Sequence, residues 1–150
     1  MAFDSKGTLN KVMLIGRLGQ DPELKYTPAG AAVVNVSIAT DTSWKDQDGN
    51  SQDKTEWHRL VFWRKQAEIL SQYSKKGDRI YVEGKLMTRS WDDKDSGQKR
   101  YITEIQVANM QFLTSKGDRD AASNSSIPEP PEPPAEYSGS DVEQGDDLPF

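Results

Sequence analysis

Residues 55–63, with the sequence TEWHRLVFW, are the most informative segment of the chain. Aromatic and aliphatic side chains dominate its second half, which predicts a β-strand over 56–63. Successive side chains of a strand point to opposite faces, so the odd and even positions separate. The even positions suit a core or a subunit interface, whereas the odd positions mix two indole rings with a guanidinium. The odd set is Trp57, Arg59, Val61 and Trp63, and the even set is His58, Leu60 and Phe62.

The flanking sequence predicts four more strands and one helix. The helix is expected over 65–76, because Ala67, Leu70 and Tyr73 share one helical face and Gly77 suits the position after a helix end. Five strands with one helix between the third and the fourth are typical of a five-stranded OB-fold barrel, an all-β fold with a small helical content. The other strands are predicted over 10–18, 32–40, 79–91 and 100–113, with a long loop or hairpin tip over 41–55 and a hairpin tip over 92–98.

The charge of the chain is divided between two parts of unlike composition. The 150 residues contain 19 Lys+Arg and 24 Asp+Glu, a net charge of −5. Residues 1–120 carry +2, whereas residues 121–150 carry −7. A segment rich in Pro, Ser, Glu and Gly cannot bury enough apolar surface to offset its ordering entropy, so 116–150 is predicted to be a disordered tail. The predicted organisation is a folded domain over 1–115, an acidic linker over 116–145 and a C-terminal tip over 146–150.

The composition argues against several classes of protein. The absence of Cys excludes disulfides, a thiol nucleophile and Cys-ligated metal sites. The single histidine, His58, cannot form a His-rich metal site, and the Asp46-x-Asp48-Gly49 segment departs from the calcium-loop pattern. Because the chain also lacks a Gly-rich phosphate-binding motif, we expect neither an enzyme nor a bound cofactor or metal. No apolar run approaches the ~20 residues of a membrane span, and no signal-peptide core begins the chain, so no membrane association is expected.

Aromatic and cationic side chains share the strand faces that the core does not need. In the predicted strand 79–91, one parity is apolar, with Ile80, Val82, Gly84 and Leu86, and the other carries the cations and an indole. Unpaired bases stack on aromatic rings and phosphates attract cations, so this combination on a barrel favours single-stranded nucleic acid. The members of this set are Trp44, Trp57, Trp63, Trp91, Arg59, Lys85 and Arg89.

Other interpretations of the same residues remain open. A tryptophan is more often a core residue than a ligand contact, although each face here has a separate apolar set to fill the core. Two rival functions also fit the sequence: an RNA-binding OB module and an adaptor that binds only proteins. A preference for RNA over DNA would identify the RNA-binding module, and a lack of tryptophan fluorescence quenching by oligonucleotides would identify the adaptor.

Several blocks of the sequence together resemble the bacterial single-stranded-DNA-binding protein family. They occur in the order expected for that family over about 8–113, and the last residues look like its acidic C-terminal tip. The blocks are Asn10-Lys11-Val12, residues 15–23 (IGRLGQDPE), Thr55-Glu56-Trp57-His58-Arg59, Lys76-Gly77-Asp78, Tyr81-Val82-Glu83-Gly84, Thr88-Arg89-Ser90-Trp91 and residues 146–150 (DDLPF).

The resemblance implies a bacterial, cytoplasmic, nucleoid-associated homotetramer that wraps and protects single-stranded DNA without sequence preference. It also implies that the tip recruits replication, recombination and repair proteins. By position, the tip residues are Asp146, Asp147, Leu148, Pro149 and Phe150, and His58 matches a subunit contact. Met87 and Ser90 depart from the family pattern, because relatives often carry Arg or Lys there. The implied DNA contacts are the base-stacking Trp44, Trp57, Trp63 and Trp91 and the basic Arg59, Lys65, Lys76 and Arg89.

Overall fold

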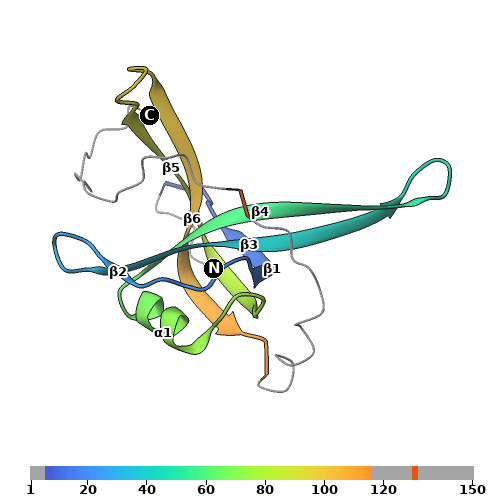
Figure 1. Cartoon of the computed structure of the whole chain (residues 1–150), viewed down its shortest axis with the longest axis horizontal. Coiled ribbons are helices and arrows are strands. Elements are labelled where there is room, and N and C mark those ends of the chain that lie inside the picture. The colour runs from blue at the N-terminus through green and yellow to red at the C-terminus, as the bar shows by residue number, and fades with distance from the viewer. Residues whose placement is uncertain (1–5, 116–129, 132–150) are drawn as a thin grey trace.

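The computed structural model describes residues 6–115 and 130–131 as a small barrel from which two long hairpins project (Figure 1). The predicted tail and tip therefore lie outside the described residues, except for Pro130 and Pro131. The elements are β1 (Val12–Leu18), β2 (Lys25–Tyr26), β3 (Ala32–Lys45), β4 (Ser51–Trp63), α1 (Lys65–Tyr73), β5 (Arg79–Asp92) and β6 (Lys99–Phe112).

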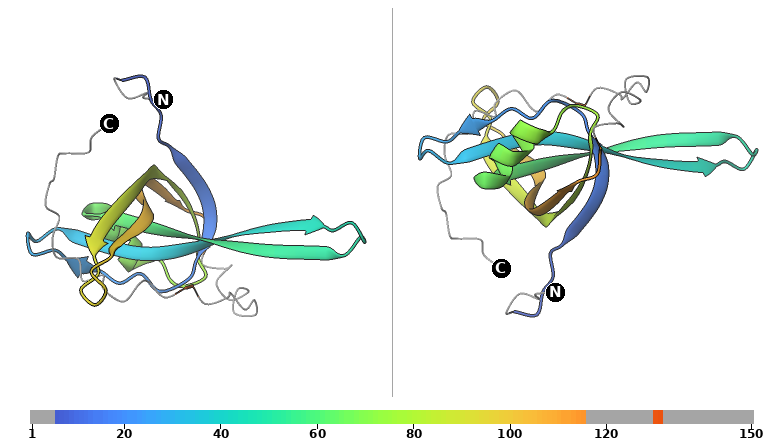
Figure 2. Two further views of the ribbon diagram at one scale, coloured as in Figure 1. Left: turned by 90° about the horizontal axis from the view of Figure 1, so that it is seen from above. Right: turned by 90° about the horizontal axis from the view of Figure 1, so that it is seen from below.

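Five of these strands close on themselves. The sheet order is β1-β5-β6-β4-β3-β2, and a further pairing of β1 with β3 completes the circle. Antiparallel pairs make up the sheet except at one seam, where β4 runs parallel to β6 with Leu60 opposite Ile105. Figure 2 shows the closed barrel from two sides, with α1 lying against one end. The predicted five-stranded OB-fold barrel with one helix before its fourth strand is confirmed.

The core of the barrel consists of the apolar side chains that lie at alternate positions of each strand. Burial alternates along β1 as predicted, and Leu60, Phe62, Ile80 and Val82 are almost fully buried. The helix contributes Ala67 and Leu70 to the same cluster. The remaining core residues are Leu18, Ala32, Val34, Val36, Ile38, Ile105 and Val107.

Leu86 was predicted to belong to the apolar core face, and this prediction is wrong. Its side chain is 49% exposed. Leu86 pairs with Ile105, which lies in the seam with β4, and beyond this pair β5 and β6 leave the barrel as a hairpin. Leu86 stands at the rim of the barrel, where it borders the hollow beside Trp57. Leu86 is therefore left at the surface.

The segment 41–55, predicted as a long loop or hairpin tip, is mostly β-strand. Strands β3 and β4 stay paired up to Lys45 and Ser51, which leaves only a five-residue turn. Polar side chains support this arm: the Thr55 hydroxyl donates to Asp41 at 2.7 Å and the Ser43 hydroxyl to Asp53 at 2.6 Å. A two-stranded arm in solvent buries no face, so its sequence lacks the apolar alternation that marks a strand.

The helix ends at Tyr73, three residues before the predicted end at residue 76. Both the backbone N–H and the hydroxyl of Ser74 donate to the carbonyl of Leu70, at 3.1 and 2.6 Å, and the chain then becomes extended. Gly77 lies in the following turn and donates to the Leu18 carbonyl, so it is not the helix cap that was predicted. Tyr73 is 57% exposed and does not join the buried face of the helix.

Candidate nucleic-acid interface

Trp57 and Arg59 line a hollow between the barrel wall and the β5–β6 hairpin. The hollow has a volume of about 330 Å³. Ser37 lies opposite Arg59 in the β3–β4 pairing, and the parallel seam between β4 and β6 places Thr103 and Ile105 beside them. Two predicted DNA contacts are thus brought together. The complete lining is Ser37, Trp57, His58, Arg59, Leu86, Thr103, Ile105 and Pro131.

The indole of Trp57 rests on Gly19. A Cβ atom at residue 19 would lie 2.5 Å from Cζ3 and 3.0 Å from Cη2 of the ring, so no side chain larger than hydrogen fits without displacing it. The Gly19 backbone is held in place by a 2.9 Å hydrogen bond from its N–H to the Ser37 carbonyl. Trp57 is half-buried. The sequence reasoning missed the role of Gly19 and of Leu86, because both depend on contacts between distant strands.

Trp91 and Arg89 lie on the other face of the β5–β6 hairpin. They alternate with Leu86 along β5, so they point away from the side that lines the hollow. Arg89 donates from Nε to Glu104 at 3.0 Å, and the Glu104 side chain is only 8% exposed. Trp91 sits opposite Arg100, which pairs with Asp93 at 3.1 Å. Lys85 is exposed on this same face.

Trp44 stands on the projecting β3–β4 hairpin and is 47% exposed. It pairs with Gln52, whereas Trp57 pairs with Ala39, and the register is unbroken between these pairs. The even and odd positions of this hairpin face opposite sides, so Trp44 and Trp57 lie on opposite faces of it. The four tryptophans therefore occupy several surfaces around the barrel and its two arms rather than one flat platform.

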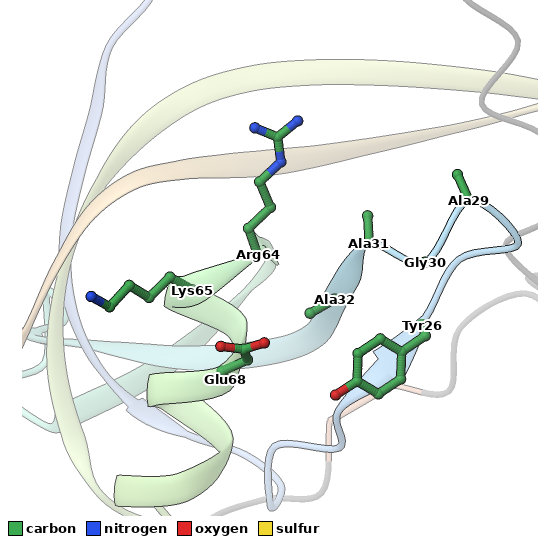
Figure 3. Close-up of a pocket in the computed structure, with 8 residues that line it drawn as sticks. All are labelled: Tyr26, Ala29, Gly30, Ala31, Ala32, Arg64, Lys65 and Glu68. Atoms are coloured by element: carbon green, nitrogen blue, oxygen red, sulfur yellow. The ribbon is translucent and has the colours of Figure 1, made fainter.

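Trp63 is the last residue of β4 and Lys65 is the first residue of α1, and Lys65 lines a second hollow of about 320 Å³ (Figure 3). Between them Arg64 adopts a φ of 56°, which side-chain-bearing residues rarely do, and turns β4 directly into α1. Figure 3 shows the Arg64 and Lys65 side chains extending away from Tyr26 and Glu68. Their charges thus face solvent and do not converge in this hollow. Lys76 is also exposed, and its backbone N–H donates to Asp21 at 2.8 Å.

His58 is occupied inside its own hairpin. Its Nε2 lies 2.8 Å from the Thr40 hydroxyl, and the side chain is half-buried. The part of the chain that the structure describes contains no cluster of His, Asp or Glu side chains arranged to hold a metal ion. Among residues 6–115 and 130–131, no helix is long and apolar enough to cross a membrane.

Hydrogen bonds perturb the pKa values of two carboxylates near the predicted contacts. The Tyr81 hydroxyl donates to Glu83, which lowers the pKa of Glu83 and raises the pKa of Tyr81. Lys54 pairs with Glu56 at 2.6 Å, so the pKa of Lys54 is raised and the pKa of Glu56 is lowered.

Two turn carboxylates are held ionised by backbone donors. The N–H of Asn50 is the main group that lowers the pKa of Asp46, and the N–H of Asp95 is the main group that lowers the pKa of Asp93. Each carboxylate accepts a hydrogen bond from a backbone N–H in the turn at the tip of one projecting hairpin. They are structural groups of the two turns.

Fold and site together describe an OB-fold nucleic-acid-binding domain. Residues 9–113 match the model of the Single-strand binding protein family, and the chain belongs to this family. It is 47% identical to the Single-stranded DNA-binding protein 1 of Chlorobaculum tepidum over 95% of this chain and 98% of that protein. It is 51% identical to the Single-stranded DNA-binding protein 1 of Xylella fastidiosa over 78% of this chain and 86% of that protein.

The fold is also similar to a solved complex. The structure of a Plasmodium falciparum SSB complex with ssDNA superimposes with a TM-score of 0.64 and 38% sequence identity. The match covers 76% of this chain and all of the other chain.

Substitution of Gly19 by Ala should misplace Trp57 while leaving the barrel intact. The added methyl group forces the indole off its seat, and we expect binding of oligo-dT to weaken by up to about 1–3 kcal/mol, the range of one stacking contact. Tryptophan fluorescence titration measures the loss. In a Trp57→Ala background the same change should have no further effect. A full additional loss there would show that Gly19 acts independently of Trp57.

Proposed function

We propose that this protein binds single-stranded DNA without sequence preference and protects it during replication, recombination and repair. The observation that carries the proposal is the Trp57–Arg59 hollow, where a partly exposed indole and a guanidinium lie side by side on a barrel wall. Membership of the Single-strand binding protein family and the similarity to two Single-stranded DNA-binding proteins support it.

The mechanism is passive binding. Indole rings stack on unpaired bases and cations neutralise phosphates, so a bound strand cannot re-pair. Neither interaction reads base edges, which explains binding without sequence preference. Because the tryptophans occupy several surfaces of the barrel and its arms, a strand that contacts all of them must wind around the protein.

The cations divide into two groups. Arg59, Lys65, Lys76 and Lys85 form no ion pair within residues 6–115 and 130–131, so their charges are available to phosphates. Arg89 shares its charge with Glu104. We therefore assign the main phosphate contacts to the first group and a smaller contribution to Arg89.

Removal of a stacking ring tests the DNA-binding proposal. Trp57→Ala and Trp91→Ala should each weaken binding of oligo-dT by roughly 1–3 kcal/mol, whereas Trp57→Phe, which keeps a ring, should lose less. Titration at two salt concentrations should give a log–log slope near −0.7 for each phosphate neutralised. Unchanged affinity in both Ala variants would refute the stacking assignment. Tighter binding of oligo-U than of oligo-dT would favour the RNA-binding alternative.

Strand β1 provides a surface for assembly into the proposed homotetramer. Met13 and Ile15 are 56% and 57% exposed on its outer face, beside Glu83 and Tyr81 of β5. Only Arg17 and Leu18 of β1 pair with β3, so the earlier part of this edge is unpaired within the described residues. An apolar strand with a free edge favours pairing with another copy. His58 remains a proposed subunit contact.

A charge placed on this strand should break the assembly. Ile15→Glu is expected to reduce the mass measured by light scattering from that of four 16.8 kDa chains to that of a smaller species. Tyr26→Glu is the matched control, because Tyr26 is 64% exposed on a different strand. A tetramer that survives Ile15→Glu would place the interface elsewhere.

The segment 146–150 is proposed to recruit other proteins. Asp146 and Asp147 are followed by Leu148, Pro149 and Phe150, a combination that suits an apolar pocket with a basic rim. The proposed setting is the bacterial cytoplasm, in association with the nucleoid, where replication, recombination and repair proteins would be the partners.

Loss of this segment separates the two activities. Deletion of residues 146–150 should abolish pull-down of replication and repair proteins and leave binding of oligo-dT within about twofold, since the stacking residues lie in the barrel and its arms. A variant with Ser138→Ala, in the same tail, is the control. Retention of the partners after the deletion would disprove this role of the tip.

A further inference from the structure

The Trp57 hollow is lined in part by a segment far along the same chain, at Pro131. We propose that Pro130 and Pro131 dock on Trp57 and hold the base-stacking position until single-stranded DNA displaces them. The inference rests on the proposed function, because it assigns a competitor to the same site. The competitor is a proline segment of the linker, not the acidic tip.

Two observations place the prolines next to the indole. Pro131 is one of the residues that line the hollow, together with Trp57 and Arg59. A Cβ built on Gly19 would lie 3.2 Å from Cγ of Pro130 and 2.5 Å from Cζ3 of Trp57. The pyrrolidine ring of Pro130 and the indole of Trp57 therefore approach the same backbone position.

The chemistry of the segment fits the hollow. Prolines favour an extended polyproline II conformation without internal hydrogen bonds, and proteins bind such segments in grooves lined by aromatic side chains. Little conformational entropy is lost when a segment of this kind binds, because its backbone is already restricted. The sequence flanks Pro130 and Pro131 with Glu129 and Glu132, and Arg59 supplies the opposite charge in the hollow.

The length of the connecting chain makes the contact frequent. Fourteen residues separate Ser115 from Pro130. A connection of that length keeps the two prolines close to the barrel, at an effective concentration of the order of millimolar. Even a weak affinity of prolines for the indole then fills the hollow for much of the time. The apparent dissociation constant for DNA then equals the intrinsic constant divided by the fraction of protein molecules whose hollow is unoccupied, because only these molecules can bind.

A matched pair of double variants of the full chain tests the proposal. Pro130→Ser with Pro131→Ser removes the docked rings, and Pro133→Ser with Pro134→Ser changes the next Glu-Pro-Pro unit in the same way. Both variants keep every charge of the tail. The first should bind a short oligo-dT about three- to tenfold more tightly, as expected for a hollow that is mostly occupied, and the second should match the parent chain.

The tighter binding of oligo-dT by the Pro130→Ser, Pro131→Ser variant should persist at high salt, because it comes from the loss of ring packing and not from a change in the tail's negative charge. Equal affinity of the two variants and the parent would overturn the proposal. So would a gain of the same size in both variants, because that would point to the tail as a whole. Failure of all three proteins to bind oligo-dT would instead contradict the proposed function.

A DNA-free measurement tests the contact itself. The four tryptophans give four indole N–H signals in an NMR spectrum, and Trp57→Phe identifies the signal of Trp57. The Pro130→Ser, Pro131→Ser variant should shift that signal and leave the other three in place. The Pro133→Ser, Pro134→Ser variant should shift none. An unmoved Trp57 signal in the first variant would show that the prolines do not occupy the hollow.

Discussion

The close approach of strands at two glycines makes the barrel and its functional surface possible. A Cβ at Gly16 would lie 2.6 Å from the carbonyl oxygen of Ala39, where β1 closes onto β3. A Cβ at Gly84 would collide with the carbonyl of Gln106, where β5 pairs with β6 and the register shifts. The approach at Gly16 allows β1 to close the barrel against β3. The approach at Gly84 allows the β5–β6 hairpin to bend away from the barrel, and the hollow beside Trp57 lies between the two.

Closure also explains why the aromatic residues are only partly buried. The barrel interior is filled by aliphatic side chains and Phe62, so the indoles are left on the outside. Trp57 rests on Gly19 and the wall, while Trp44 stands on an arm. A ring fixed along one edge loses little freedom when a base stacks on its open face. Partial burial therefore prepares Trp57 for stacking in a way that full exposure would not.

The alternation of apolar residues predicted the fold within the barrel and failed outside it. Strands around Ile38, Phe62 and Val82 bury one face, so their sequence carries a two-residue period. The arms bury neither face, and the segment 41–55 therefore gave no strand signal although its strands pair up to the five-residue turn. Leu86 failed for the opposite reason: it continues the apolar pattern to the rim of the barrel, where its side chain is half exposed although its partner Ile105 is buried.

For the candidate site, residue types were predictable and their grouping was not. Mixed indoles and cations indicated the kind of ligand from local sequence alone. Which of them meet is decided by the parallel seam between β4 and β6, a contact between segments over forty residues apart, and by the parity of each hairpin.

Trp57 and Arg59 offer the hollow an aromatic ring and a positive charge, and both a nucleotide and a Glu-Pro-Pro unit combine a ring with a negative charge. A site that recognises bases without reading their edges cannot reject other ligands of the same shape and charge sign. Competition from the chain's own tail then follows from the chemistry that makes the binding independent of sequence. The preference for DNA over the prolines must come from the number of contacts, because a DNA strand contacts many such sites at once, whereas the tethered prolines contact one.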